Sequence, residues 1–281
     1  MSDMLLDGSS LEMTAKDVSG LVAARALIRP GSHVNITFLG NETVDMRVAA
    51  ATAVAECGFV PVPHISARRL RSTDELVEFL DRLRDVDAAT KVFVVGGDPS
   101  TPHGPFDSAL DIIETGLLPA HGTTSVAISG YPEGHPDIPR EVLREHLVRK
   151  CRTLSSQGIR PEIITQFGFD VAPVMQWIAD VRDEGIEAGI RIGVPGPAKV
   201  RQLLKFAGRF GIGANAMILK KYGLSLSNMI GATGPDLFVA ELAAQLGDDS
   251  RMGSVGLHFY TFGGLEDTAS WIHTYRQGLV K

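Results

Sequence analysis

The stretch "SVAISGYPEGHP", residues 125–136, decides the fold. Its first five residues are small or apolar, as in a strand that is buried on both faces. Three side chains able to hold or move protons follow, Tyr131, Glu133 and His135, on a backbone that two prolines stiffen. Parallel sheets gather their chemistry at the carboxyl ends of their strands. The stretch therefore predicts a core strand that ends at a site.

The same organisation recurs along the chain. Short β-rich runs alternate with longer amphipathic runs, and eight strand–helix units in 281 residues predict a (β/α)8 TIM barrel. The alternative, an open doubly wound sheet, is disfavoured because no GxGxxG follows the first strand and no GxxxxGK[ST] occurs. The predicted strands cover residues 9–13, 33–39, 60–66, 91–96, 125–129, 161–167, 190–194 and 255–261, and the predicted helices cover about 17–29, 43–57, 72–85, 106–116, 139–157, 171–185, 198–210 and 266–277.

Residues 213–250 exceed what one strand–helix unit needs, and they include the helical run "PDLFVAELAAQLG". We interpret them as extra helices inserted before the last strand. Neither a linker nor a low-complexity segment divides the chain, so the sequence predicts a single domain over residues 1–281.

Composition narrows the class of protein. A net charge of -6 and a pI near 5.8 argue against a nucleic-acid partner, because phosphate binding needs a basic face. Cys57 and Cys151 form no metal motif, and the eight histidines show no close ligand spacing, so we expect no metal site. The N-terminus lacks the pattern of a signal peptide, and no apolar run could span a bilayer. We expect a soluble, cytoplasmic protein without a membrane partner.

Nearly every predicted strand end carries a titratable or amide side chain. Each alone can be explained by packing, by capping a turn or by solvation. Their joint placement at one end of a barrel indicates an active site. In strand order these residues are Glu12, Asn35 and Thr37, His64, Asp98, Tyr131 with Glu133 and His135, Thr165 with Gln166 and Asp170, and His258 with Tyr260.

Six short sequence runs at or near the predicted strand ends occur in an order that resembles the methylenetetrahydrofolate reductase family. They are "PHISAR", "VVGGDPSTPHGPF", "SVAISGYPEGHP", "IITQFGFD", "IGVPGP" and "LHFYTFGG", and the resemblance covers about residues 58–265. It implies a cytoplasmic flavoprotein of one-carbon metabolism. Such an enzyme is an oxidoreductase that reduces 5,10-methylenetetrahydrofolate to 5-methyltetrahydrofolate with NADH or NADPH, through FAD, or runs in reverse in a demethylation pathway. The family's frequent homo-oligomers make an oligomer the expectation here.

The resemblance also implies roles for single residues. Glu12 matches the family's general acid, which protonates N10 of the folate, and Asp98 matches the aspartate that stabilises the resulting cation. Gln166 suits the pterin edge, and Tyr260 is expected to contact the substrate. The residues expected to bind the flavin cofactor are Thr37, His64, Gly97, Asp98, Tyr131, His135 and Lys150.

The chain departs from the family pattern in places that leave other functions open. Gly96 stands where the family commonly has an arginine, and the residues after Glu12 lack the usual aromatic and proline residues. One alternative is a tetrahydrofolate-binding barrel without redox activity, acting as a carrier or as the partner of a methyltransferase. Another is an unrelated barrel enzyme, such as a lyase that uses Glu12 or Asp98 as a base.

Overall fold

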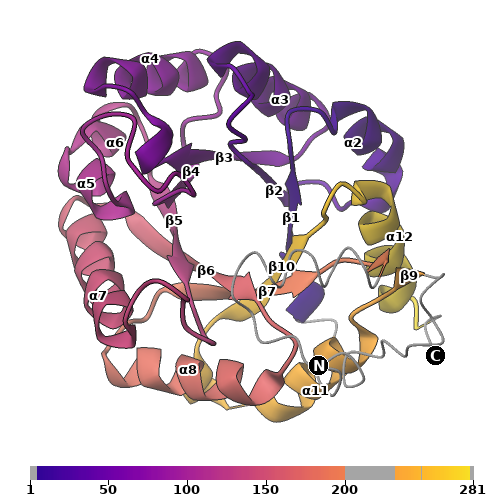
Figure 1. Cartoon of the computed structure of the whole chain (residues 1–281). Coiled ribbons are helices and arrows are strands. Elements are labelled where there is room, and N and C mark those ends of the chain that lie inside the picture. The colour runs from indigo at the N-terminus through magenta and orange to yellow at the C-terminus, as the bar shows by residue number, and fades with distance from the viewer. Residues whose placement is uncertain (1–4, 200–231, 248, 279–281) are drawn as a thin grey trace.

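The computed structural model describes residues 5–199, 232–247 and 249–278. Eight parallel strands close into a barrel in chain order, and the last strand, β10, pairs with the first, β1 (Figure 1). The TIM-barrel prediction is therefore confirmed. The barrel strands are β1 (Ser10–Met13), β2 (His33–Ile36), β3 (Val60–Ser66), β4 (Lys91–Val95), β5 (Ser125–Gly130), β6 (Arg160–Phe167), β7 (Gly189–Pro195) and β10 (Val255–Tyr260).

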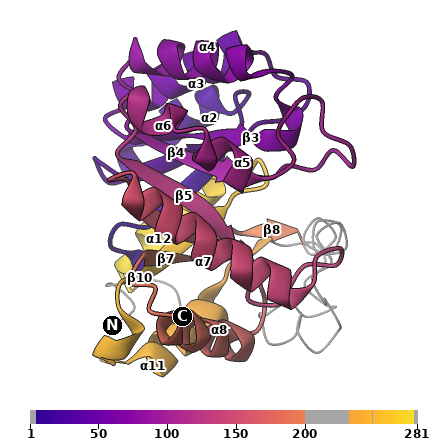
Figure 2. The same ribbon diagram turned by 90° about the vertical axis from the view of Figure 1, so that its left-hand side faces the viewer.

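Helices surround the barrel, and several begin where the sequence supplies a cap. The side chain of Thr43 accepts a hydrogen bond from the Met46 amide, and that of Ser72 accepts one from the Glu75 amide. Figure 2 shows α5 and α7 against the outside of the strands. Within the described residues no helix has the length and hydrophobicity to cross a membrane. The α-helices are α2 (Val18–Ala24), α3 (Val44–Glu56), α4 (Thr73–Arg84), α5 (Ala109–Glu114), α6 (Leu117–Ala120), α7 (Arg140–Ser156), α8 (Val171–Asp183), α11 (Asp236–Leu246) and α12 (Leu265–Arg276).

The region before the last strand differs from its prediction in one respect. The helix predicted over 198–210 falls mostly outside the described residues, and its first two residues form strand β8 (Ala198–Lys199). Strand β8 pairs antiparallel with β9 (Ala232–Thr233). Helix α11 packs against α8, and its Asp236 Oδ1 accepts a hydrogen bond from Trp271 Nε1 of α12 at 3.2 Å. Helix α11 thus fills the place between α8 and α12 in the outer ring (Figure 1).

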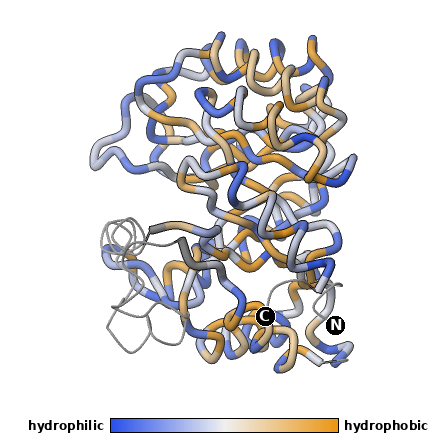
Figure 3. The backbone as a smooth tube through the Cα atoms, turned by 90° about the vertical axis from the view of Figure 1, so that its right-hand side faces the viewer, coloured by the Kyte–Doolittle hydropathy of each residue, from blue (hydrophilic) through white to orange (hydrophobic). Residues whose placement is uncertain are grey.

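The barrel interior is layered. Val62, Phe93, Ala127 and Ile164 come from four neighbouring strands and form an apolar layer of their own. Hydrophobic stretches run through the interior of the fold in Figure 3, with hydrophilic ones in the loops. Polar side chains lie on both sides of this layer, because side chains alternate along each strand. One polar layer lies at the carboxyl ends of the strands and the other at their amino ends.

Candidate active site

Glu12 lies at the end of β1, where the chain leaves the barrel wall. It is flanked by Asn35 of β2, its partner in the strand register, and by β10 on the other side. Its side chain is 17% exposed, and its carboxyl forms no hydrogen bond within the part of the chain that the structure describes. Burial raises the pKa of Glu12 from 4.5 to about 7, while His64 opposes this shift and Asp17 adds to it. A carboxyl with this pKa can donate a proton near neutral pH.

His64 of β3 lies inside the barrel beside Glu12. Its Nε2 is 3.5 Å from Nδ2 of Asn35, and its ring meets the Phe93 ring edge-on at 4.7 Å. Burial lowers the pKa of His64 to about 4, although the charge of Glu12 opposes this. His64 is therefore neutral at physiological pH, and it offers hydrogen bonds rather than charge.

His258 of β10 is completely buried inside the barrel, next to Glu12. Its Nδ1 lies 2.8 Å from Oγ of Ser10, and its Nε2 lies 3.9 Å from Oε2 of Glu12. Burial lowers the pKa of His258 to about 3, and the charge of Arg191 lowers it further. Its Nε2 has no hydrogen-bond partner among the residues that the structure describes.

Tyr260 closes the site on the β10 side. Its hydroxyl donates a hydrogen bond of 3.1 Å to the carbonyl of Thr165, next to a register shift in β6. Burial raises the pKa of Tyr260 well above its usual value, and Glu12 and Tyr131 raise it further. The Tyr260 ring also lies 5.3 Å from Phe167 and 6.3 Å from Phe262, so aromatic side chains form one wall of the mouth.

We call Glu12, Asn35, His64, His258 and Tyr260 the mouth cluster. Hydrogen bonds between side chains and backbone groups fix the loops around the mouth cluster. Thr37 Oγ1 donates to the carbonyl of Met13 at 2.7 Å, and Thr261 Oγ1 donates to the carbonyl of Glu12 at 2.8 Å. The buried Glu42 carboxylate accepts hydrogen bonds from the amides of Ala15 and Leu39.

Asp98 lies on the loop after β4, at the same end of the barrel but in a different environment. Its side chain is 49% exposed and pairs with Nη2 of Arg69 at 2.5 Å. The preceding Gly97 has a φ of +98°, and a Cβ there would clash with Oγ of Ser66. Gly97 thus lets the loop pass closely over the end of β3, and Asp98 faces a cation rather than an open pocket.

Tyr131 and His135 follow β5, as predicted, and their rings meet edge-on at 5.4 Å. Nδ1 of His135 accepts a hydrogen bond from the Asp137 amide at 3.1 Å, and burial raises the pKa of Tyr131. The two side chains therefore brace the loop in one shape.

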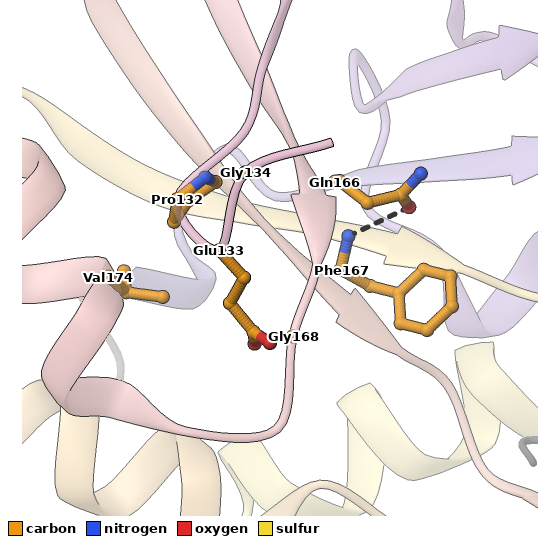
Figure 4. Close-up of a pocket in the computed structure, with 7 residues that line it drawn as sticks. All are labelled: Pro132, Glu133, Gly134, Gln166, Phe167, Gly168 and Val174. Atoms are coloured by element: carbon orange, nitrogen blue, oxygen red, sulfur yellow. Dashed lines mark hydrogen bonds between the residues drawn. The ribbon is translucent and has the colours of Figure 1, made fainter. Parts of the chain in front are cut away.

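Gln166 and Glu133 line a small pocket between the ends of β5 and β6 (Figure 4). Oε1 of Gln166 accepts a hydrogen bond from the Phe167 amide at 3.0 Å. Glu133 reaches toward Gly168, where an added Cβ would lie 2.6 Å from its Oε1. Burial raises the pKa of Glu133, although a hydrogen bond from the Phe169 backbone opposes this. Glu133 therefore supports the loop that begins after the end of β6, next to Gln166.

Lys150 is not brought to the mouth. Helical periodicity places it on the same face of α7 as Leu147, Cys151 and Leu154, which are buried in the helix layer. Burial lowers the pKa of Lys150 to about 8, and its side chain is only 8% exposed. This placement does not support the prediction that Lys150 meets a cofactor phosphate.

Two polar contacts were not predicted from the sequence. Ser10 is the hydrogen-bond partner of His258, and Arg69 is the partner of Asp98. The run "ARR" after β3 could have signalled Arg69, but a serine inside a strand carries no such signal. Among the described residues, no group of three or more His, Cys, Asp or Glu side chains could hold a metal ion.

Two solved structures share the fold of this chain. No protein-family model matches the chain. A barrel from Clostridium thermocellum that binds two copies of 5-methyl-5,6,7,8-tetrahydrofolic acid superposes with a TM-score of 0.57 at 10% identity, over 94% of both chains. A GH18 chitinase from Pseudoalteromonas aurantia gives 0.54 at 13% identity, over 96% of this chain and 100% of the other. Dihydropteroate synthase from Thermus thermophilus gives 0.48 at 11%, over 96% and 92%. At these identities the likeness extends to the fold alone.

Proposed function

We propose that this barrel is an NAD(P)H-dependent reductase that converts 5,10-methylenetetrahydrofolate to 5-methyltetrahydrofolate. The observation that carries the proposal is Glu12, a buried carboxyl at the end of β1 whose pKa burial raises to about 7. A folate ligand of the Clostridium thermocellum barrel supports the substrate class, and the order of the six sequence motifs supports the reaction.

The chemistry assigns Glu12 a single proton transfer. Glu12 protonates N10 of the folate, and the bond between N10 and the methylene carbon breaks to leave a cation at N5. A hydride then reduces the methylene carbon to a methyl group. The Glu12 carboxylate takes up a proton again before the next turnover. Because the acid must be protonated, turnover should decline as the pH rises above about 7.

The cation at N5 needs negative charge nearby, and Asp98 is the family's residue for this. In this chain Arg69 neutralises Asp98 at 2.5 Å. The cationic folate would have to compete with Arg69 for that carboxylate. The Asp98 side chain is 49% exposed but that of Arg69 is only 16% exposed, so taking Asp98 away from Arg69 costs free energy that the bound cation must offset.

The described residues fit FAD in part. Thr37, His64, Gly97 and Tyr131 lie at the ends of four neighbouring strands, and the buried Oγ of Ser66 at the end of β3 lacks a partner among the described residues, so a polar ring system would find hydrogen bonds there. The residues expected near the phosphates of FAD fit that cofactor less well. Lys150 points into the helix layer, and Arg149 pairs with Glu114 at 2.6 Å. When bound, FAD would supply the hydride that NAD(P)H delivers to it.

Purified protein should oxidise NADH or NADPH when 5,10-methylenetetrahydrofolate is present, with or without added FAD, and its absorption spectrum reports bound flavin. Glu12→Gln should lower kcat by roughly 10²–10⁴-fold. Glu141→Gln, an exposed carboxyl on α7, is the matched control and should leave kcat unchanged. Absence of turnover with both nucleotides would contradict the proposal.

The placement of Lys150 favours a second function, a tetrahydrofolate-binding barrel without redox activity. Calorimetric binding of tetrahydrofolate by a colourless protein that does not oxidise either nucleotide would support it. The expected oligomer and the cytoplasmic location stay predictions, and light scattering of the purified protein tests the first of them.

A further inference from the structure

We propose that His258, held by Ser10, is a positioning residue that keeps the proton of Glu12 on the carboxyl oxygen facing the ligand. The inference rests on the proposed function, because it takes Glu12 as the acid. It starts from an unusual feature of the interior: Ser10 and His258 are both 0% exposed, yet the Nε2 of His258 has no hydrogen-bond partner among the described residues and lies 3.9 Å from Oε2 of Glu12.

Hydrogen-bond accounting selects the tautomer of His258. A neutral imidazole has one N–H donor and one acceptor nitrogen, and a serine hydroxyl has a single hydrogen to donate. If Ser10 donates to Nδ1, the hydrogen of His258 lies on Nε2 and faces the Glu12 carboxyl. If Nδ1 instead carries the hydrogen and donates to Ser10, the serine hydrogen has no acceptor in the described residues, because His258 is its only partner there. Each tautomer leaves one buried hydrogen without a hydrogen bond, but only in the Nε2–H tautomer does that hydrogen face a nearby carboxyl oxygen, Oε2 of Glu12 at 3.9 Å, so this tautomer is favoured.

An N–H at Nε2 fits both protonation states of Glu12. In the acid form it directs Oε2 to act as the acceptor, so the proton resides on Oε1. After transfer the same N–H faces the new carboxylate and stabilises its charge. His258 itself neither gains nor loses a proton. The gap of 3.9 Å is longer than a hydrogen bond, and such contacts often shorten when the ligand binds.

The other groups around Glu12 cannot replace this donor. His64 on β3 is neutral, and its Nε2 faces the donor nitrogen of the Asn35 side chain at 3.5 Å, while Asp17 brings like charge. Tyr260 on β10 already donates its hydroxyl hydrogen to the Thr165 carbonyl. Among these three groups and His258, His258 is therefore the one whose N–H is uncommitted and directed at the carboxyl.

The first test determines the tautomer in the natural protein and uses one variant for signal assignment only. Two-dimensional ¹H–¹⁵N NMR of the histidine rings distinguishes the two tautomers, and His258→Gln identifies the signals of this ring. We expect the Nε2–H form in the ligand-free protein. A hydrogen on Nδ1 would overturn the proposal.

The second test follows the carboxyl itself, by ¹³C NMR titration of protein labelled in its glutamate side chains, with Glu12→Gln to assign the signal. His258→Phe removes the donor and should raise the pKa of Glu12 by about one unit or more. His258→Gln, whose amide nitrogen can occupy the place of Nε2, should restore most of that shift. His33→Gln, at the opposite end of the barrel, should leave the Glu12 titration unchanged.

The outcomes separate the two proposals. If Glu12 of the natural protein titrates near 4.5, the proposed function loses its acid. If it titrates near 7 and His258→Phe does not move it, Glu12 stays the acid and only the positioning role is lost. In turnover, His258→Phe should lower kcat by roughly tenfold or more with little change in KM, and should shift the upper limb of the pH profile together with the NMR titration.

Discussion

Polar clusters lie on both sides of the apolar layer in this barrel, and they differ in how their atoms are paired. The amino-end cluster comprises His33, Lys91, Glu162 and Arg191. Lys91 Nζ lies 2.8 Å from Nε2 of His33, and Arg191 Nη2 lies 3.2 Å from Nδ1 of the same ring. Arg191 also pairs with Glu162 at 3.1 Å and donates to the carbonyl of Gly8. Each member bonds to another member, and Nε of Arg191 is the one buried atom of this cluster without a partner among the described residues, so the cluster closes the barrel as a polar plug.

The mouth cluster is paired only in part. The Glu12 carboxyl has no hydrogen bond within the described residues, and Oδ1 of Asn35 and Nε2 of His258 are buried there without partners. The two clusters also shift carboxyl groups in opposite directions. Burial raises the pKa of both Glu12 and Glu162, but for Glu162 the nearby Arg191, His33 and Lys91 outweigh burial and hold its pKa below the usual value. Unpaired polar atoms at the mouth cost stability, and they are the atoms that a ligand can satisfy.

The sharpest test of this difference is to remove the charge from each carboxyl. A group with a raised pKa in the folded state binds its proton more tightly there, so its contribution to stability falls as the pH rises from 4.5 to about 7. Glu12→Gln should therefore raise the free energy of unfolding by about 3 kcal/mol at pH 8, and by less than about 1 kcal/mol at pH 5. Urea unfolding at the two pH values measures this. A destabilised Glu12→Gln at pH 8 would mean that the mouth is paired after all.

The corresponding change at the amino end should have the opposite sign. Glu162→Leu leaves Lys91 and Arg191 without their carboxylate, and breaking a buried ion pair typically costs about 3–5 kcal/mol. Because the Glu162 side chain is 24% exposed, we expect a smaller loss, roughly 2–3 kcal/mol at pH 7. The same urea experiment measures it. An unchanged stability would show that the plug contributes nothing, and the contrast with the mouth would disappear.

The titration of His33 in the amino-end cluster gives the next test of the difference between the two clusters. Burial lowers the pKa of His33 from 6.5 to about 4, with Arg191 and Lys91 lowering it further, so the unfolded chain takes up a proton before the folded one does. Stability due to His33 is complete above pH 6.5 and is lost as the pH falls toward 4. His33→Gln should therefore reduce the difference in unfolding free energy between pH 7.5 and pH 5 by about 2 kcal/mol. If the unfolding free energies of the natural protein and of the variant depend equally on pH, the shifted titration of His33 is contradicted.

The contrast between the clusters also shows how far sequence analysis reaches here. Alternating β-rich and amphipathic runs predicted all eight barrel strands to within a few residues, because hydrophobic periodicity reports directly on burial. Strand ends predicted Glu12 and His64 as neighbours, since barrel closure brings such ends together. The partners of these residues could not be predicted. Ser10 meets His258 across 248 positions, and Lys150 is turned inward by the helix register rather than by its charge.

The smallest effect is expected at the rim, where Asp98 is paired with Arg69 and half exposed. Arg69→Gln removes a partner of Asp98, whose side chain is 49% exposed while that of Arg69 is 16% exposed, and ion pairs with one solvated partner typically contribute about 1 kcal/mol or less. We therefore expect a loss in unfolding free energy below about 1 kcal/mol, reduced further by added salt. Under the proposed function the same change should strengthen binding of a cationic folate analogue, because Arg69 no longer competes with the ligand for Asp98. A titration calorimetry comparison with Arg82→Gln, which removes an exposed pair with Asp45 on the outer helices, isolates the effect. Weaker binding by Arg69→Gln alone would show that Arg69, rather than Asp98, meets the ligand.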